Sequence, residues 1–187
     1  MGTDRLDEVL DAAYTCLTRY GARRTTMDDI ASQMGVSRSA VYQYVRGKDE
    51  AFRLLAERLH QEALGRARDA AADAGAPAAE RIRGVLAAKL DLAFRVGGAS
   101  PHTAELLDER NRLFGGICGT FSASLHDLLT DLFTRAGTVE GVPPDQAARM
   151  CLALAAGLET AREGEALVGP ATAALVGGLL DERRAPR

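Results

Sequence analysis

The sequence predicts an all-α protein. Only 5% of its 187 residues are aromatic and none is Trp, whereas Ala and aliphatic residues are abundant. The β-branched residues are few and scattered, a distribution that favours helices over sheet. Apolar side chains also recur at helical spacing in segments that Gly and Pro separate. We therefore expect a soluble protein built of packed helices.

The N-terminal region is predicted to hold short helices. Residues 4–20 place apolar side chains on one helical face, and Gly21 ends that helix. Thr26 is a suitable N-cap for a second helix, because Asp29 three residues later resembles the partner in a capping box. Apolar residues follow at helical spacing until Gly35, so this second helix is expected to have only two turns.

A third short helix is predicted between Ser37, its N-cap, and Gly47. Two short helices joined by a tight turn containing Gly form a helix-turn-helix unit, whose second helix enters the DNA major groove. Polar residues that should project from this helix are Arg38, Ser39, Gln43 and Tyr44. The alternative is an ordinary helical hairpin whose polar face is simply solvated.

The local charge is compatible with DNA binding, although the whole-chain net charge of -3 is not an indication of it. Residues 19–48 carry six basic and two acidic side chains, whereas residues 67–187 carry 13 basic and 16 acidic ones. The basic surplus coincides with the predicted helix-turn-helix.

The stretch TTMDDIASQMGVSRSAVYQYVRGKDEAF, which begins at Thr25, resembles the DNA-binding signature of the tetracycline-repressor (TetR) family of bacterial transcription regulators. The shared features are the helix-opening Thr, the IA and GVS of the turn, the aromatic run and the Lys followed by an acidic residue. The resemblance covers about 45 residues from Leu6 onward. Val45, where the family usually has Phe, and the Arg46-Gly47 pair depart from the pattern, which affects packing.

The resemblance implies a sequence-specific regulator, a homodimeric repressor that a small-molecule effector releases from a palindromic double-stranded DNA operator. It implies that four residues contact or position phosphates: Thr26, Tyr42, Tyr44 and Lys48. It implies that three residues face base edges: Arg38, Ser39 and Gln43. From the residues alone, Tyr42 is equally well explained as a core aromatic beside Val41 and Val45.

The resemblance also implies two domains. Residues 1–46 would form the helix-turn-helix DNA-binding domain, and residues 47–187 a helical effector-binding and dimerisation domain, entered through a connecting fourth helix. Helices expected in the second domain lie at about 79–96, shortly after Pro101, and at about 109–136, 144–163 and 170–183. The last two form a hairpin suited to a homodimer interface. The alternative is that this hairpin packs only on its own chain.

An apolar effector pocket is the expected ligand site of the second domain. Candidate lining residues are Leu90, Phe94, His102, Asn111, Phe114, Ile117, Cys118 and Phe121, and Arg95 and His126 are further polar candidates. For most of the apolar members, ordinary core is the better explanation.

Catalytic, metal and membrane functions are not indicated by the sequence. The three cysteines are far apart, and His102 and His126 have no further ligands at metal-binding spacing. Without a nucleophile beside a base or a phosphate-binding Gly loop, we expect no enzyme and no cofactor, although a helical enzyme or adaptor that does not bind DNA is the alternative. No segment reaches the roughly 20 apolar residues of a membrane helix, so a soluble protein is expected, and the absence of a disulfide pattern among the cysteines favours a reducing, cytoplasmic compartment.

Overall fold

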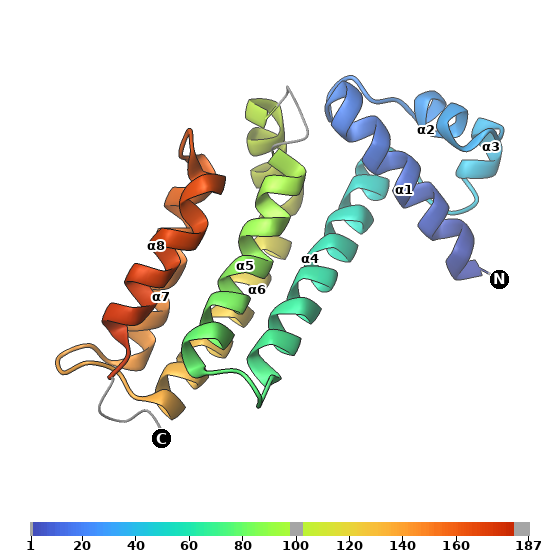
Figure 1. Cartoon of the computed structure of the whole chain (residues 1–187). Coiled ribbons are helices and arrows are strands. Elements are labelled where there is room, and N and C mark those ends of the chain that lie inside the picture. Colours follow the sequence, from blue (N-terminus) through green and yellow to red (C-terminus); the bar gives the residue numbers. More distant parts are fainter. Residues whose placement is uncertain (1, 98–102, 182–187) are drawn as a thin grey trace. The chain divides into compact units, whose positions relative to one another are not determined.

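The computed structural model describes the backbone of residues 2–97 and 103–181, and the side chains of residues 5–97 and 116–181. Eight helices lie in these ranges (Figure 1). Their bounds are α1 Gly2–Tyr20, α2 Met27–Met34, α3 Arg38–Val41, α4 Lys48–Ala72, α5 Ala78–Gly97, α6 Thr103–Ala136, α7 Pro144–Thr160 and α8 Gly164–Leu179. The all-α prediction is therefore confirmed, with the helix-turn-helix at the N-terminal end of the chain.

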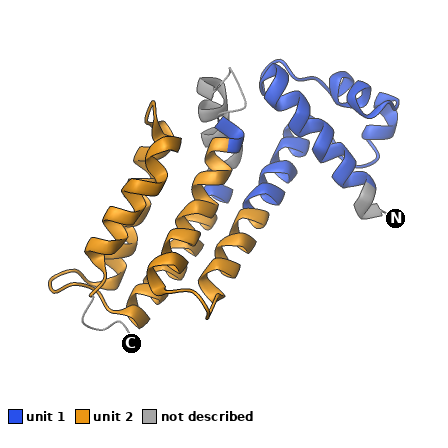
Figure 2. Cartoon of the chain, viewed as in Figure 1, with its two compact units in different colours: residues 1–60, 95–118 blue, residues 61–94, 119–187 orange. Residues whose placement is uncertain are grey.

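The chain divides into two compact units (Figure 2). One unit comprises residues 1–60 and 95–118, and the other comprises residues 61–94 and 119–187. This division cuts through α4, α5 and α6 and describes packing alone. The functional boundary expected near residue 46 stays a prediction.

The first unit has its core where α1, α2 and the segment after α3 meet. Val9 and Ile30 are fully buried, and so is Val41 at the end of α3. Buried Thr25 ties the loop before α2 to the end of α1, because its hydroxyl lies within donating distance of the Cys16 carbonyl, at 3.1 Å, and of the Gly21 carbonyl, at 2.8 Å. The apolar residues of the helix-turn-helix thus fix the three helices to one another before any DNA is present.

The second unit has an aliphatic core built by α5 to α8. Residues with little or no exposed surface include Ile82, Val85, Leu86, Leu125, Leu129, Phe133, Ala147, Cys151 and Val176. Among the described residues, one buried ion pair lies within this apolar core, between Lys89 of α5 and Glu159 of α7. An isolated antiparallel bridge joins Thr138 to Leu180 beyond the end of α8.

Four helix boundaries in the second half differ from the prediction, one of them the end of α8, which lies at Leu179 rather than near 183. α6 is one continuous helix from Thr103, where a short helix and a second one from about 109 were expected, and α7 ends at Thr160 rather than near 163. α8 begins at Gly164 rather than at Pro170, which lies inside it. A Pro inside a helix removes one backbone hydrogen bond, and α8 continues through Pro170 despite that cost.

The early start of α8 depends on close backbone approach. Gly164 is buried, and an added Cβ would overlap the Leu158 carbonyl oxygen near the end of α7. Only Gly therefore allows so tight a connection between the two helices. Among the helices that are described, none combines the length and the apolar character needed to cross a membrane.

Candidate nucleic-acid interface

A reciprocal capping box begins α2. The Asp29 backbone N–H donates to Thr26 Oγ1 at 3.2 Å, and the Thr26 N–H and hydroxyl donate to Asp29 Oδ2 at 2.8 and 2.7 Å. These bonds favour the carboxylate, and they lower the pKa of Asp29 below its ordinary value. The capping box predicted from the sequence is confirmed. Thr26, expected to contact or position a phosphate, also has a structural role.

The turn between α2 and α3 is set by Gly35. Its φ of 68° lies in the left-handed region, and the following Val36 N–H donates to the Ala31 carbonyl at 3.0 Å. Ser37 then accepts a hydrogen bond from the Ala40 N–H at 3.3 Å, as expected of an N-cap. Two caps on either side of one Gly thus fix the direction in which α3 leaves the turn.

The third helix is shorter than predicted but the chain stays coiled beyond it. α3 ends at Val41, and the next turn is tightened by bonds from the Gln43 N–H to the Ala40 carbonyl and from the Tyr44 N–H to the Val41 carbonyl, at 3.3 and 3.0 Å. Bonds that span three residues rather than four wind the backbone more tightly. Gln43 and Tyr44 consequently lie outside the α-helix proper.

Tyr42 lies on the exposed side of this segment. It is 42% exposed, whereas Val41 and Val45 are 0% and 2% exposed. The interpretation of Tyr42 as a core aromatic is therefore wrong. Its own segment provides the reason, because the tight turn points Val41 and Val45 inward and leaves Tyr42 between them on the outer side.

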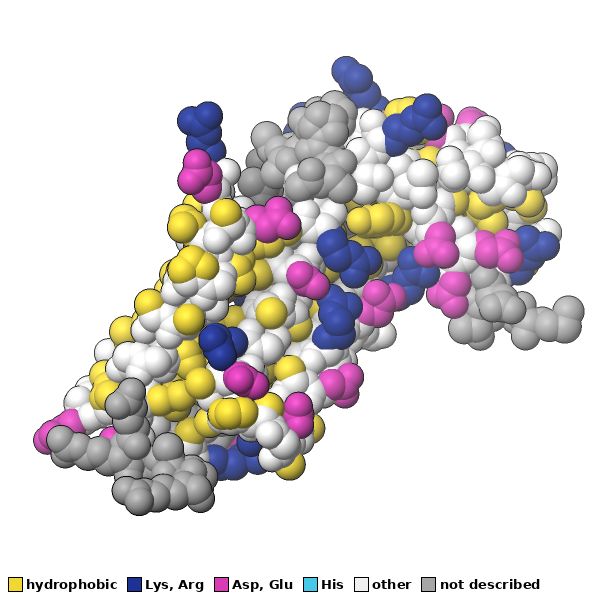
Figure 3. Space-filling view, viewed as in Figure 1, with side chains coloured by type: hydrophobic (Ala, Val, Ile, Leu, Met, Phe, Trp, Pro, Cys, Tyr) yellow, Lys and Arg dark blue, Asp and Glu magenta, His cyan; other side chains and the backbone are white. Residues whose placement is uncertain are grey.

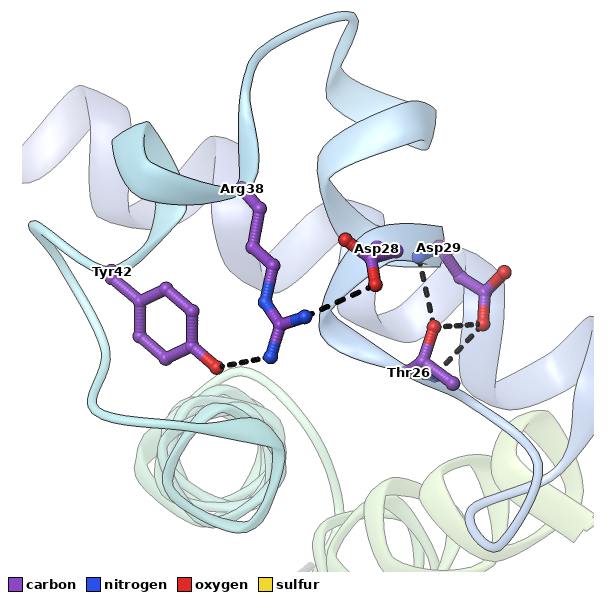
Figure 4. Close-up of polar contacts among 5 residues, drawn as sticks. All are labelled: Thr26, Asp28, Asp29, Arg38 and Tyr42. Atoms are coloured by element: carbon purple, nitrogen blue, oxygen red, sulfur yellow. Dashed lines mark hydrogen bonds and ion pairs between the residues drawn. The ribbon is translucent and has the colours of Figure 1, made fainter.

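Arg38 is held by two neighbours (Figure 4). Its Nη1 donates to Asp28 Oδ2 on α2 at 3.2 Å, and its Nη2 donates to the Tyr42 hydroxyl at 3.0 Å. The guanidinium carbon also lies 5.4 Å from the centre of the Tyr42 ring. The Tyr42 hydroxyl and then the Asp28 carboxylate raise the pKa of Arg38 above its ordinary value. Sequence reasoning selected Arg38 and Tyr42 but missed Asp28, whose only signal was a second acidic residue beside Asp29.

Lys48, the first residue of α4, contacts the loop after α1. Its Nζ donates to the Ala22 carbonyl at 3.0 Å and to the Arg23 carbonyl at 3.3 Å. The ammonium therefore fastens this loop to α4, a role that sequence spacing could not reveal because the partners lie 25 and 26 residues away. The remaining predicted contacts, Ser39 and Gln43, are exposed.

The candidate pocket residues divide between the two units. Leu90, Phe94 and Phe121 belong to the second unit, where Leu90 and Phe121 are buried and Phe94 is half-buried; Ile117 and Cys118 belong to the first and are half-buried. Cys118 Sγ lies 3.6 Å from His60 Nε2. His102 lies outside the described residues, as do the side chains of Asn111 and Phe114. The effector pocket stays a prediction. In the portion of the chain with described side chains, no three His, Cys, Asp or Glu residues are grouped to hold a metal ion.

Two short capped helices, a Gly turn and an exposed polar segment form a helix-turn-helix, the unit whose second helix can enter the DNA major groove. Residues 9–58 match the model of the family described as bacterial regulatory proteins, tetR family. This match lies in the N-terminal part of the chain and includes the stretch from Thr25 to Phe52 that carries the resemblance.

One curated relative matches a short part of the chain. An uncharacterized HTH-type transcriptional regulator, YfiR of Bacillus subtilis (strain 168), is 42% identical over 53 residues, which cover 28% of this chain and 26% of that protein. The match therefore spans about a quarter of the curated relative.

Solved structures share the fold over nearly the whole chain. A regulator of the TetR/AcrR family from Thermobifida fusca YX-ER1 has a TM-score of 0.67 and 22% identity, covering 94% of this chain and 98% of that one. The ketosteroid transcriptional regulator KstR2 of Mycobacterium tuberculosis has a TM-score of 0.67 and 20% identity, covering 95% and 96%. FadR from Bacillus subtilis, in complex with stearoyl-CoA, has a TM-score of 0.68 and 19% identity, covering 91% and 97%.

Proposed function

We propose that the protein is a homodimeric repressor that binds a palindromic DNA operator and leaves it when a small-molecule effector binds. The observation that carries the proposal is the contrast within one segment, where Val41 and Val45 are buried while Arg38, Gln43 and Tyr44 are exposed. A fixed apolar frame that presents polar side chains is what reading a DNA groove requires.

The exposed residues suit two kinds of DNA contact. An Arg can donate two hydrogen bonds to a guanine edge, and a Gln can both donate to and accept from an adenine edge. Arg38 and Gln43 are therefore proposed to read bases, together with Ser39. Tyr42 and Tyr44 are exposed and carry hydroxyls that suit phosphate oxygens. Thr26, the N-cap of α2, and Lys48, the first residue of α4, are likewise proposed to contact or position phosphates.

The proposed dimer interface is α8 with α7. Residues 166–180 contain no charged side chain. Yet part of this segment faces water, since Leu167 is 45% exposed and several Ala and Gly residues of the helix are exposed too. Hydrophobic side chains gather along α8 in Figure 3. A long uncharged, exposed helix is costly in water, and burying it against a second copy removes that cost. A dimer would also bring two helix-turn-helix units to the DNA, which adds phosphate contacts and avidity.

The proposed effector is a small apolar molecule. The second unit has an aliphatic core formed by several helices, and such bodies offer apolar cavities between their helices. Two structural neighbours are a ketosteroid transcriptional regulator and a regulator in complex with stearoyl-CoA, so apolar compounds form the first screen. An effector would act by binding the DNA-incompetent state more tightly than the DNA-bound state.

The DNA-binding proposal is tested by selecting duplexes from a random pool and measuring affinity against salt. We expect one palindromic sequence to be enriched, and log K to fall with log salt with a slope of about -0.9 for each phosphate contact. Arg38→Ala should lose discrimination at one base position per half-site, whereas Lys48→Ala should weaken all duplexes alike. Absence of duplex binding at low salt would refute DNA binding and favour the adaptor or enzyme alternative.

The repressor mechanism is tested separately. Apolar compounds that raise the melting temperature are added to the preformed operator complex, and release is followed by fluorescence anisotropy. A compound that binds clearly at saturation yet leaves operator affinity unchanged would contradict effector release. Sedimentation of the free protein tests the dimer, with Leu167→Glu expected to give monomers because it places a charge on the uncharged face.

A further inference from the structure

The contact between Asp28 and Arg38 is not needed to build the helix-turn-helix. Both side chains are more than half exposed, at 67% and 54%, so their removal opens no cavity. The capping of α2 is performed by Thr26 and Asp29, and Asp28 takes no part in it. Its carboxylate instead reaches across to α3, where its partner is the Arg proposed to read bases.

We propose that Asp28 is a positioning residue that sets sequence discrimination by fixing the Arg38 guanidinium between itself and Tyr42. This inference rests on the proposed DNA-binding function. Figure 4 shows the guanidinium lying between the two partners, with one terminal nitrogen directed to each. The planar group is thereby fixed in orientation as well as in place, since two bonds from different nitrogens oppose its rotation.

The arrangement leaves enough donors for DNA. A guanidinium carries five N–H groups, of which the two bonds to Asp28 and Tyr42 use two. A bidentate contact to the O6 and N7 of guanine needs two more, so the fork can read a base while it is still supported. A side chain ordered before binding also loses less conformational entropy on binding, which favours the correctly placed base over other contacts.

The carboxylate has a second effect on selectivity. An Arg that moves freely can transfer its charge to any phosphate, and such contacts strengthen binding to every sequence. Because Asp28 is paired with Arg38, the Arg38 guanidinium must break this ion pair before it can move to a phosphate. The pair therefore disfavours sequence-independent use of Arg38, although an exposed ion pair of this kind contributes only modestly.

The test measures discrimination at separate base positions of the selected operator. Arg38→Ala and Gln43→Ala first identify the position that each side chain reads. Asp28→Asn, which keeps the size and removes the charge, should then lower discrimination about 2- to 5-fold at the Arg38 position, the range expected for an exposed pair. Discrimination at the Gln43 position should not change, and Asp28→Glu should restore part of the loss at the Arg38 position.

Two controls separate positioning from other causes. Asp69→Asn makes the same charge change at an exposed site of the other compact unit, and it should leave discrimination unaltered. In an Arg38→Ala background, Asp28→Asn should have no further effect on discrimination, because the residue acts through Arg38. An equal effect in both backgrounds, or an equal loss at every base position, would overturn the proposal.

Failure of this inference differs from failure of the proposed function. If the native protein discriminates between duplexes and Asp28→Asn leaves the Arg38 position unchanged, only the positioning role is refuted. If the native protein binds no duplex, or binds all duplexes equally, the proposed sequence-specific function is itself refuted.

Discussion

Gly35→Ala should destabilise the helix-turn-helix without creating any steric overlap. A Cβ built at Gly35 meets nothing within 4 Å, so the cost is conformational alone. The backbone there has a φ of 68°, a region that costs an L-residue about 1–2 kcal/mol. Reduced flexibility of the unfolded chain offsets about 0.4–1 kcal/mol. We expect a net loss of about 1 kcal/mol, which corresponds to about 2–4 °C in melting temperature for a chain of this size.

The matched control is Gly65→Ala in the interior of α4. The added Cβ again meets nothing within 4 Å beyond its own helix, but the backbone is helical, so Ala should be more favourable by about 1 kcal/mol. The same chemical change therefore has opposite predicted signs at the two positions. The comparison isolates backbone conformation from side-chain volume and hydrophobicity.

Tyrosine fluorescence is a suitable assay for the first unit. The chain has no Trp, and its four Tyr residues, at positions 14, 20, 42 and 44, all lie in that unit. Thermal unfolding followed through Tyr should show a lower midpoint for Gly35→Ala, while circular dichroism follows the helices of the whole chain. Equal shifts for the two variants, or a stabilised Gly35→Ala protein, would refute the assignment of a left-handed turn at Gly35.

Three further predictions concern charged and titratable side chains. Glu159→Ala should lower the free energy of unfolding by about 3–5 kcal/mol, because it leaves Lys89 buried without its carboxylate. Replacing Lys89 by Met and Glu159 by Leu together should recover most of that loss. Urea unfolding measures both variants, and equal losses would contradict the pairing. The pKa of Asp29 is lowered in the folded protein, so the Asp29 carboxylate stabilises the fold above its ordinary pKa of 3.8, and this stabilisation is lost as pH falls through the lower folded pKa. Asp29→Asn should therefore flatten the dependence of stability on pH in that range. Burial raises the pKa of Cys151 to about 12 from 9.0, so stability should fall as pH rises between these values, and a native-state thiol reagent should leave Cys151 unlabelled until the protein unfolds.

The helix-turn-helix was predictable because its signals are local. Its signals are two capping pairs, Thr26 with Asp29 and Ser37 with Ala40, and the turn at Gly35. The members of each pair lie within four residues of one another, so their spacing in the sequence is enough to predict that they meet. The match to the tetR family model includes the same short stretch. By contrast, the predicted start of the last helix at about 170 is wrong. The helix begins at Gly164, whose close approach to Leu158 is a packing contact that sequence periodicity does not reveal.

The sequence by itself determined the helical class, the two capped helices and the set of polar residues proposed to meet DNA, since periodicity and capping are properties of neighbouring residues. Only the tertiary structure decided that Tyr42 is exposed, that Asp28 supports Arg38, and that Lys48 fastens the loop after α1. The contacts of Asp28 and Lys48 join residues 10 or more positions apart, so their partners depend on how the helices pack. Which exposed side chains are already engaged is therefore a property of the fold, and the proposed base-reading residues must be tested together with those supports.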